Sequence, residues 1–583
     1  MTLASLKGAT DLRGVARLLE VKAGMLSYVL YKQPKPELYE KFEISKKTGG
    51  VREISAPCPH LKLIQQRLAA VLLGCSSELK AKQATPVKNK NYVRREVSHG
   101  FTKGRSIVSN GQEHTTRRFV FNADLSDFFG TINFGRVRGF FIKDENFLLP
   151  PAVATILAQI ACSENKLPQG SPCSPVISNL IGHLLDMRLV ELALRQGCTY
   201  TRYADDLTFS TNKLDFPVTI AVPKEGDPHG WLPGSGLQKI VQKSGFSLNE
   251  KKTRLQYRDS RQEVTGLTVN RKVNVPATYR YTVRAMANNL FKTGRFEHVI
   301  HFTDEKGSAQ ELRRDGHAGE LRGMLSYIDQ VDLYNSERER ENGLISLGAP
   351  GRLELYRRAI YFDSFYAPSK PVIVCEGKTD NTYIKHAILQ LLGHYPTLAS
   401  PSAAGGKPEL KVRLYKYADR RSAVVTDIGG GVGGLCHLIK HYHADVLNRF
   451  RAPRPMHPVI LLIDNDLGSD NIYGAISGLL KIKKPKGLRS FIHLFSNFYV
   501  VPTPLGPGNS HTMIEDFFDA ATQAVTLSGK TFSRKDEDSS KHYGKAAFAR
   551  DVVAKHAGSI DFNGFRPILD RLRDVLLDYP TRP

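Results

Sequence analysis

Two adjacent aspartates, Asp205 and Asp206, are the residues whose types and spacing most clearly indicate chemistry in this sequence. The flanking segments 201–204 and 207–210 are short and rich in strand-forming residues, a pattern that predicts a hairpin with both carboxylates at its tip. Neighbouring carboxylates repel each other unless a cation neutralises them. Two Mg²⁺ ions, which prefer oxygen ligands, could hold the attacking and leaving oxygens of a phosphoryl transfer there. A solvated turn with two acidic residues is the alternative.

A third carboxylate and a loop rich in Pro and Gly lie upstream of this pair. The segment 119–123 predicts a strand that ends at Asp124. A two-metal polymerase needs one acidic residue at a strand end and two on a hairpin. The loop 167–175 precedes a predicted helix, and its composition suits backbone that approaches a flat base pair and its phosphates. These segments favour a polymerase site over a solvated turn.

A second group of acidic residues follows two apolar strands beyond residue 370. Glu376 follows the predicted strand 371–375, and Asp464 and Asp466 follow the predicted strand 458–463. Their i, i+2 spacing puts both aspartates on one face of the strand. Strands that alternate with helices predict a parallel sheet, whose ligand sites form at the carboxyl ends of its strands. Acidic helix caps and loop residues are the alternative.

Length and composition limit the classes of protein to which this chain can belong. At 583 residues we expect two to four domains, and 41% apolar residues indicate a folded protein. The seven scattered cysteines include no CxxC pair, which argues for a reducing cytoplasm and against a disulfide framework or a zinc knuckle. We expect no signal peptide and no transmembrane helix. A formal net charge of +25 favours a nucleic acid as the partner over a membrane, because the sequence carries no basic anchor or lipidation signal.

The order of the first set of motifs resembles the reverse transcriptases, and more narrowly the bacterial retron reverse transcriptases. Asp124 is followed by Leu-Pro-Gln-Gly at 167–170, by Tyr-Ala-Asp-Asp at 203–206, and by the segments 244–253 and 264–270. Each motif is short, but five in the expected order are hard to obtain by accident. The similarity extends from about residue 46 to residue 276.

The resemblance implies roles for individual residues. Asp124, Asp205 and Asp206, with Leu125 beside them, would hold two Mg²⁺ ions, with Mn²⁺ as an alternative, for attack by a primer hydroxyl on a dNTP. The implied nucleotide-binding residues are Arg52, Asp127, Phe128, Phe129, Gln169, Gly170 and Lys252. Among them, Phe129 would exclude a 2′-OH, Arg52 would clamp the triphosphate, and Lys252 would serve as an acid for pyrophosphate. A core aromatic residue for Phe129 and solvated charges for Arg52 and Lys252 are the alternatives.

Two further motifs point to retrons within this family. Asn110 and His114 match an NAxxH element with Gly in place of Ala, and Val264, Thr265 and Gly266 match a VTG element, so we predict a retron-specific role in RNA recognition for these residues. A structural histidine is the alternative for His114. Retron enzymes copy part of a partner noncoding RNA from the 2′-OH of an internal guanosine. The branched RNA–DNA product (msDNA) stays bound, which here would involve the basic segment 280–360.

The acidic residues beyond residue 370 resemble a topoisomerase–primase (Toprim) domain, and more narrowly the overcoming-lysogenization-defect nucleases. The similarity covers about residues 370–575 and rests on Glu-Gly at 376–377 and Asp-x-Asp at 464–466. It implies a Mg²⁺ site at Glu376, Asp464 and Asp466, a second one completed by Asp380, Glu515 and Asp516, and a catalytic role for Lys545. No tyrosine-bearing gate domain or zinc module is recognisable, so hydrolysis of DNA or RNA is favoured over topoisomerase or primase activity.

We therefore predict a multidomain α+β and α/β protein. Residues 1–275 would form the fingers and palm of a right-hand reverse transcriptase, 276–367 a helical thumb and connector, and 368–583 a Toprim domain with a mainly parallel sheet. The predicted function is a cytoplasmic bacterial retron polymerase, fused to a nuclease effector of anti-phage defence and assembled as a homo-oligomer with its msDNA. One alternative is a mobile-element or repair reverse transcriptase whose Toprim domain processes target DNA. A nucleic-acid scaffold without activity is the other.

Overall fold

The computed structural model describes residues 2–45, 51–84, 96–227, 229–303, 308–341, 350–402, 406, 408–417, 420–485, 487–534 and 538–582. The chain divides into two compact units. The first unit comprises Met1–Arg280, Val299–Leu312 and Gln330–Ser346, and the second comprises Tyr281–His298, Arg313–Asp329 and Leu347–Pro583.

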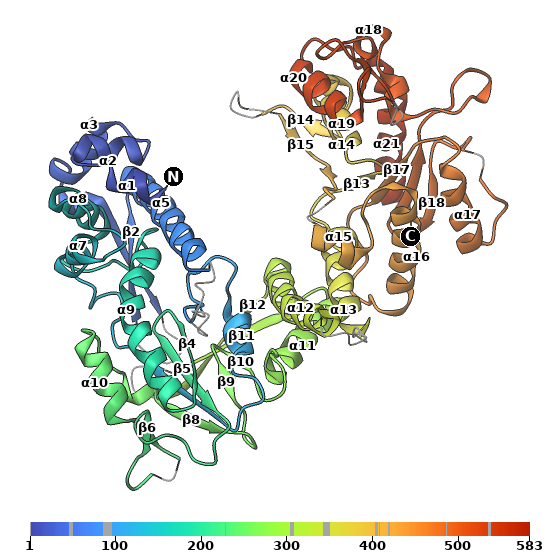
Figure 1. The fold of residues 1–583 in the computed structure, drawn as a ribbon. Coiled ribbons are helices and arrows are strands. Elements are labelled where there is room, and N and C mark those ends of the chain that lie inside the picture. The colour runs from blue at the N-terminus through green and yellow to red at the C-terminus, as the bar shows by residue number, and fades with distance from the viewer. Residues whose placement is uncertain are drawn as a thin grey trace. The chain divides into compact units, whose positions relative to one another are not determined.

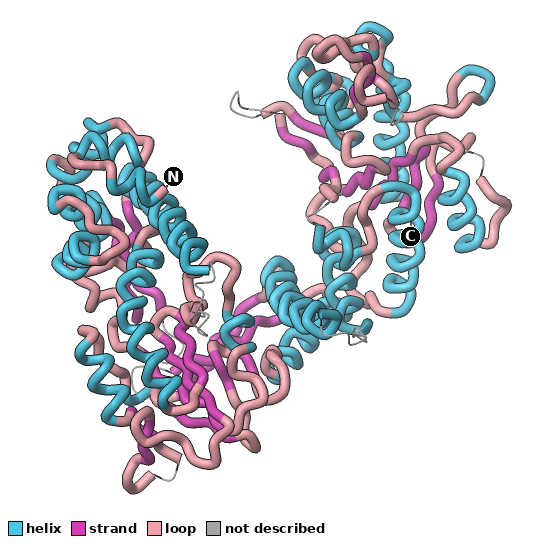
Figure 2. The backbone as a smooth tube through the Cα atoms, in the orientation of Figure 1, coloured by secondary structure: helices cyan, strands magenta, loops and turns pink. Residues whose placement is uncertain are grey.

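A four-stranded antiparallel sheet forms the centre of the first unit (Figure 2). Its strands run in the order β4 (Thr199–Tyr203), β5 (Asp206–Thr211), β3 (Phe119–Asp124) and β8 (Arg254–Tyr257). Helix α9 (Ser174–Arg195) packs against β4, and α10 (Ser235–Lys243) packs against α9. The strand predicted to end at Asp124 and the hairpin predicted around Asp205 and Asp206 are both present.

Helices and a hairpin precede this sheet in the chain (Figure 1). The long helix α5 (Pro59–Ala84) packs against α1, α3, α8 and α9, and its contact face contains Leu61, Ile64 and Leu68. The hairpin of β1 (Tyr39–Ser45) and β2 (Val51–Pro57) is in register with Phe42 opposite Ile54, and its predicted turn at 46–50 lies outside the described residues. The other helices before β3 are α1 (Leu3–Lys7), α2 (Leu12–Leu18), α3 (Ala23–Tyr31), α4 (Lys35–Leu38) and α6 (Ile107–Gln112), whereas α7 (Phe134–Lys143) and α8 (Pro151–Ala161) lie between β3 and β4.

Shorter elements complete the first unit. Two small hairpins are formed by β6 (Ala221–Pro223) with β7 (Trp231–Pro233) and by β9 (Glu263–Val264) with β10 (Leu267–Thr268). The 3₁₀ turn η1 (Glu250–Lys252) leads into β8.

A five-stranded sheet forms the centre of the second unit. Its order is β16 (Arg413–Leu414), β13 (Val372–Cys375), β17 (Val459–Ile463), β19 (Phe498–Pro502) and β18 (Ile492–Phe495). Neighbouring strands are parallel except β18, which is antiparallel to β19. All residues of β17 are buried, because helices cover both faces and neither face needs polar side chains.

The two faces of this second sheet are covered by different helices (Figure 1). Ile373, Ile460 and Tyr499 share a hydrophobic cluster with α14 (Asp380–Gln390), the π-helical turn η6 (Phe548–Val553) and α21 (Arg566–Asp578). On the other face lie α16 (Gly431–Asn448), whose Tyr442 ring contacts Phe498, and α17 (Ser469–Leu480), which packs on α16. Shorter elements flank the sheet: η5 (Ile514–Phe517), α15 (Arg420–Thr426), α18 (Ala520–Gln523), α19 (Lys545–Ala547), α20 (Ala554–His556), β14 (Ala399–Ser400) with β15 (Glu409–Leu410), and β20 (Thr531–Phe532) with β21 (His542–Tyr543).

The segment 276–367 is not wholly helical. It contains α11 (Ala277–Thr293), α12 (Ala318–Glu341), α13 (Pro350–Tyr361) and the π-helical turn η2 (Phe362–Tyr366), but β11 (Glu297–Thr303) pairs with β12 (Ala309–Asp315) between the first two helices. Val299, Ile300 and Phe302 favour strand at that position. Along the described residues, no helix combines the length and the apolar content that a membrane span requires.

Candidate polymerase and hydrolase sites

Three carboxylates gather at one end of the antiparallel sheet. Asp124 and Asp206 lie directly opposite each other on β3 and β5, and Asp205 stands in the turn that joins β4 to β5. The backbone N–H of Leu125 donates to the carbonyl of Asp205 at 2.9 Å, which ties the end of β3 to this turn. The strand register therefore brings together three of the residues predicted to bind metal.

The buried side chain of Arg202 holds the turn at Ala204 and Asp205 in place. The guanidinium of Arg202 donates two 2.8 Å bonds to Asp186 on α9 and a third, at 3.0 Å, to the carbonyl of Ala204. Neither member of this ion pair reaches solvent to a significant extent, with exposed side-chain fractions of 0% and 3%. Gly100 packs on the other side, where a Cβ would lie 2.5 Å from the amide nitrogen of Ala204.

The electrostatics of this site favour a bound cation. Desolvation raises the pKa of Asp206 to about 6, although the residue reaches the surface, and the charges of Asp205 and Asp124 add to the rise. The pKa of Asp205 is raised by burial and by Asp124. Lys252 in η1 already donates to Asp124 at 2.9 Å, and its ammonium group neutralises part of the cluster. An all-oxygen set of repelling carboxylates fits Mg²⁺.

The predicted base-pair loop contacts the hairpin of β1 and β2. The N–H of Ser55 on β2 donates to the carbonyl of Gln169 at 2.7 Å. Gly170 has a φ of +123°, and a Cβ there would lie 2.6 Å from the carbonyl oxygen of Ser55. Arg52 lies on the same strand opposite Ile44 and is exposed, so its side chain is accessible to a ligand.

The residues that follow β3 differ in exposure. Asp127 is exposed and has a φ of +43°. Phe128 is buried and stacks on Phe246, with ring centroids 5.5 Å apart. Phe129 is half-buried, and its ring centroid lies 6.2 Å from that of Phe101. The structure therefore leaves part of Phe129 accessible, which its predicted contact with a sugar requires.

The two motifs predicted to be specific to retrons lie close together beneath the catalytic hairpin. His114 is fully buried and bonds to Thr201 on β4 and Ser210 on β5, both at 2.7 Å, and burial lowers its pKa to about 3. Asn110, also fully buried, accepts a 2.6 Å bond from the Thr201 hydroxyl. Any part that these two residues play in RNA recognition would therefore be indirect.

The VTG motif forms the small hairpin next to α6. Val264 is buried on β9, and Thr265 and Gly266, with φ values of 48° and 79°, make the turn to β10. The hydroxyl of Thr265 donates to the carbonyl of Ile107 at 3.4 Å. Gly111 fits where the motif has alanine, because a Cβ there would lie 3.3 Å from Val269.

In the second unit, carboxylates meet at the carboxyl ends of β13 and β17. The backbone N–H of Asp464 donates to Glu376 at 3.3 Å, and the N–H of Ile514 donates to Asp464 at 2.8 Å, which brings η5 to the same place. Asp380 begins α14 and accepts a 2.7 Å bond from the N–H of Gly377. Lys545 donates to Glu515 at 3.1 Å.

These groups perturb one another strongly. Burial, followed by the charges of Asp380, Glu376 and Glu515, raises the pKa of Asp464 to about 8. Burial also raises the pKa of Glu376 to about 7, and Asp466 and Asp380 contribute to the rise. One carboxylate oxygen of the fully buried Glu515 has no hydrogen-bond partner, as expected of an oxygen that binds a cation. The residues present therefore fit a Mg²⁺ site.

Two of the predicted residues are engaged in local structure. Asp466 accepts a 3.1 Å bond from the N–H of Ser469 at the start of α17, while its charge still acts on Glu376. Asp516 accepts a 2.7 Å bond from the N–H of Met513 and pairs with Arg534. Asp516 could serve a metal only by giving up these partners, and its predicted role stays a prediction.

Sequence reasoning missed the residues that hold the polymerase turn in place. Arg202 and Asp186 are charged, and charged residues are expected at the surface. The signal that could have identified Arg202 is its position two residues before Ala204, on a strand whose other residues are buried or partly buried. Gly100 gives no comparable signal in the sequence.

Comparisons with known proteins agree with the geometry of the first site. A family model described as reverse transcriptase (RNA-dependent DNA polymerase) matches residues 44–270. Retron Mx65 reverse transcriptase of Myxococcus xanthus is 32% identical over 341 residues, which cover 56% of this chain and 69% of that protein. Retron Ec86 reverse transcriptase of Escherichia coli is 34% identical over 45% of this chain and 72% of its own length. Retron Mx162 reverse transcriptase of M. xanthus is 34% identical over 50% of this chain and 58% of its own length.

Proposed function

Because this chain belongs to the retron reverse transcriptases, we propose that its first unit copies a partner noncoding RNA into branched RNA–DNA, starting from an internal 2′-OH. The observation that carries the proposal is the register of Asp124 opposite Asp206, with Asp205 in the adjoining turn. Three carboxylates at one strand end are the arrangement that nucleotidyl transfer requires. The match to a family model of RNA-dependent DNA polymerases supports the choice of an RNA template.

The residues of this chain would divide the work of nucleotide addition. Asp124, Asp205 and Asp206, with the backbone at Leu125, would hold Mg²⁺, or Mn²⁺ in its place. The bound metal would supply charge neutralisation and lower the pKa of the primer hydroxyl. Lys252, whose ammonium group lies 2.9 Å from Asp124, would transfer a proton to departing pyrophosphate. Gln169, Gly170, Phe129, Asp127 and Arg52 would surround the incoming dNTP.

The RNA partner and the product would be recognised mainly through their phosphates. The net charge of +25 supports binding to a polyanion, and duplex contacts of this kind do not depend on base sequence. We place the protein in the bacterial cytoplasm, where its RNA is transcribed, and propose a homo-oligomer that keeps its msDNA bound.

Isolation of the product from cells tests this proposal. The gene and its upstream DNA are expressed together, and short nucleic acids are extracted with and without treatment by a debranching enzyme. We expect wild type to yield a band that debranching shortens, and Asp205→Asn to yield none, because the amide cannot hold the cation. A linear product from wild type would refute branched priming, and a product of any kind from Asp205→Asn would refute the assigned site.

We propose that the second unit is a Toprim-like nuclease. Glu376, Asp464, Asp380 and Glu515 converge from four elements on one place, and an oxygen of Glu515 is buried without a partner. Such a site could hold Mg²⁺ for phosphodiester hydrolysis, with Lys545 stabilising the negative charge that develops. Incubation with DNA and RNA in Mg²⁺ tests it, with protein that is expressed without the upstream DNA and so carries no msDNA. Asp464→Asn is expected to abolish cleavage and Asp470→Asn to preserve it, and cleavage by Asp464→Asn would refute the site.

The fusion of the two activities suggests a role in defence against phage. We propose that bound msDNA restrains the nuclease, so that loss of DNA synthesis releases it. Cells that express the double variant Asp205→Ala, Asp206→Ala are then expected to grow more slowly than cells that express wild type. Cells that express the triple variant, with Asp464→Asn added, are expected to grow as well as wild type. Equal growth of all three strains would contradict restraint by msDNA.

A further inference from the structure

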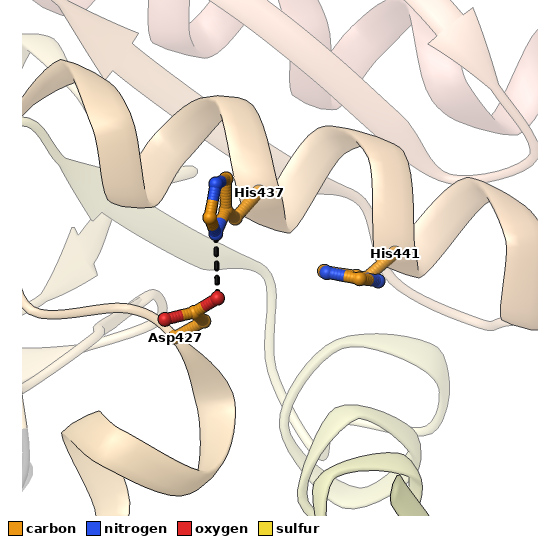
Figure 3. A group of neighbouring side chains, drawn as sticks. All are labelled: Asp427, His437 and His441. Atoms are coloured by element: carbon orange, nitrogen blue, oxygen red, sulfur yellow. Dashed lines mark hydrogen bonds and ion pairs between the residues drawn. The ribbon is translucent and has the colours of Figure 1, made fainter. Parts of the chain in front are cut away.

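Three side chains in the second unit form a group that neither proposed activity uses. Asp427, His437 and His441 each offer a ligand atom, and these atoms lie within 4.8 Å of one another (Figure 3). His437 Nδ1 and a carboxylate oxygen of Asp427 are 2.5 Å apart. Ligand atoms within this distance of one another can converge on a single ion.

The local structure holds these side chains in place. His437 and His441 are four residues apart on α16 and therefore project from the same face of the helix, one turn apart. Asp427 faces them from the loop that follows α15 and has a φ of +61°. Figure 3 shows one ring nitrogen of His441 turned toward the other two residues.

Buried contacts hold both the loop that carries Asp427 and the helix α16 that carries the two histidines. The hydroxyl of Tyr361 donates to the carbonyl of Thr426 at 2.8 Å, immediately before Asp427. On α16, the buried Tyr442 donates to Asn497 at 2.8 Å, and Asp445 accepts a 2.9 Å bond from Arg358. The ligand atoms would thus need little rearrangement to bind an ion.

We propose that Asp427, His437 and His441 form a binding site for a divalent transition metal ion of the zinc class. Two imidazole nitrogens and one carboxylate oxygen suit Zn²⁺ and its neighbours, whereas Mg²⁺ prefers oxygen ligands alone. The site therefore differs in metal preference from the all-oxygen clusters of the two proposed active sites. Asp427 and His437 are exposed, with side-chain fractions of 57% and 51%, so an ion and its remaining water ligands have access.

One neighbouring group competes with the metal. Arg357 donates to Nδ1 of His441 at 3.2 Å, and a metal bound to the other ring nitrogen requires the ring proton to move to Nδ1. Arg357 can then donate to Asp445 alone, which it already approaches at 3.5 Å. Binding thus needs a proton shift within the ring of His441 and release of the proton that His437 Nδ1 and Asp427 share, but no change of fold.

The site would fix the backbone next to the acidic cluster. Only three residues separate Asp427 from Gly431, whose N–H donates to the carbonyl of Glu376 at 3.1 Å. An ion that joins Asp427 to α16 would hold this loop, and through it the backbone of Glu376, in one position. The proposal concerns ion binding and stands whether or not the second unit cleaves nucleic acid.

Metal analysis of the full-length protein tests the site. The protein is stripped with EDTA, loaded with Zn²⁺ in the presence of excess Mg²⁺ to compete at the acidic clusters, desalted, and analysed for zinc. We expect wild type to retain one equivalent of zinc more than the double variant His437→Ala, His441→Ala. The control variant His556→Ala changes an exposed histidine elsewhere in the unit and is expected to retain as much zinc as wild type. Equal zinc in wild type and the double variant would overturn the proposal.

A second variant separates loss of a ligand from loss of folding. Asp427→Ala removes an exposed side chain at a φ of +61°, where alanine is less favourable than aspartate, so we expect the metal-free variant to unfold cooperatively at a slightly lower temperature than wild type and to lose the same equivalent of zinc. Zn²⁺ should also raise the unfolding temperature of wild type but not that of Asp427→Ala, because only the folded ligand set binds the ion. A zinc content or a zinc-induced shift that Asp427→Ala retains would show that the ion is held elsewhere.

Discussion

The acidic cluster of the second unit should destabilise the metal-free protein as pH rises. The pKa of Asp464 is raised from 3.8 to about 8 by burial and by Asp380, Glu376 and Glu515. Between these values the folded state binds a proton that the unfolded state has released, so the free energy of unfolding falls with increasing pH. At about 1.4 kcal/mol per pKa unit, the fall due to Asp464 between pH 5 and pH 8 is about 3.5 kcal/mol.

Asp464→Asn removes this penalty while an amide oxygen can still accept the bond from Ile514. We expect the stability of the metal-free variant relative to wild type to increase by about 3.5 kcal/mol between pH 5 and pH 8, which corresponds to about 7–14 °C in unfolding temperature. Part of the effect passes through Glu376, because the two carboxyls interact. Mg²⁺ should stabilise wild type at pH 8 and leave Asp464→Asn nearly unchanged.

Calorimetry in EDTA at pH 5 to 8 measures the effect. The only tryptophan, Trp231, belongs to the first unit, so its fluorescence identifies that unit's transition. Asp470→Asn, an exposed carboxyl paired with Lys484, is the control and should behave as wild type. The account of the cluster is wrong if the second unit of wild type shows no fall in stability with pH, or if Asp464→Asn is no more stable than wild type at pH 8.

Three further predictions concern the first unit. Lys252→Met should lower the rate of DNA synthesis by about 10²–10⁴-fold in primer-extension assays, because the residue is the proton donor nearest Asp124; an unchanged rate would exclude that role. Arg202→Met should destabilise the unit by about 3–5 kcal/mol in urea unfolding followed by Trp231 fluorescence, because Asp186 is left buried and uncompensated. Arg202→Met, Asp186→Leu should recover part of this loss, and equal stability of the single variant and wild type would contradict the argument. His114→Leu should cost about 1–3 kcal/mol in the same assay, because Thr201 and Ser210 lose a buried partner; no loss would show that water replaces the ring.

Local sequence predicted where these strands end, because a short apolar segment followed by an acidic residue is compatible with few structures other than a buried strand that ends near the surface. The segments 119–124 and 458–464 each form a buried strand that delivers a carboxylate to its end, and the hairpin around Asp205 follows from its β-prone flanks. The segment 297–315 was expected to be helical and contains a hairpin, because charged residues there obscured a short alternation of strand formers.

Contacts between distant residues could not be predicted in this way. Asn110 and His114 match a motif, but nothing in the motif indicates that both are buried against Thr201 and Ser210. The buried pair of Arg202 and Asp186 joins a strand to a helix, and its stability depends on an enclosure that only the folded chain provides. The group of Asp427 and two histidines likewise exists only because a loop folds back onto α16.

The central claim is that two separate acidic sites in one chain perform synthesis and hydrolysis. Primer extension on an RNA template and nucleic-acid cleavage test it most directly. Both are measured in Mg²⁺ for wild type, Asp206→Asn and Asp464→Asn, each expressed without the upstream DNA so that no msDNA is bound. We predict that Asp206→Asn loses extension and retains cleavage, and that Asp464→Asn loses cleavage and retains extension. Extension by Asp206→Asn, or loss of both activities in either variant, would contradict the assignment of two independent sites.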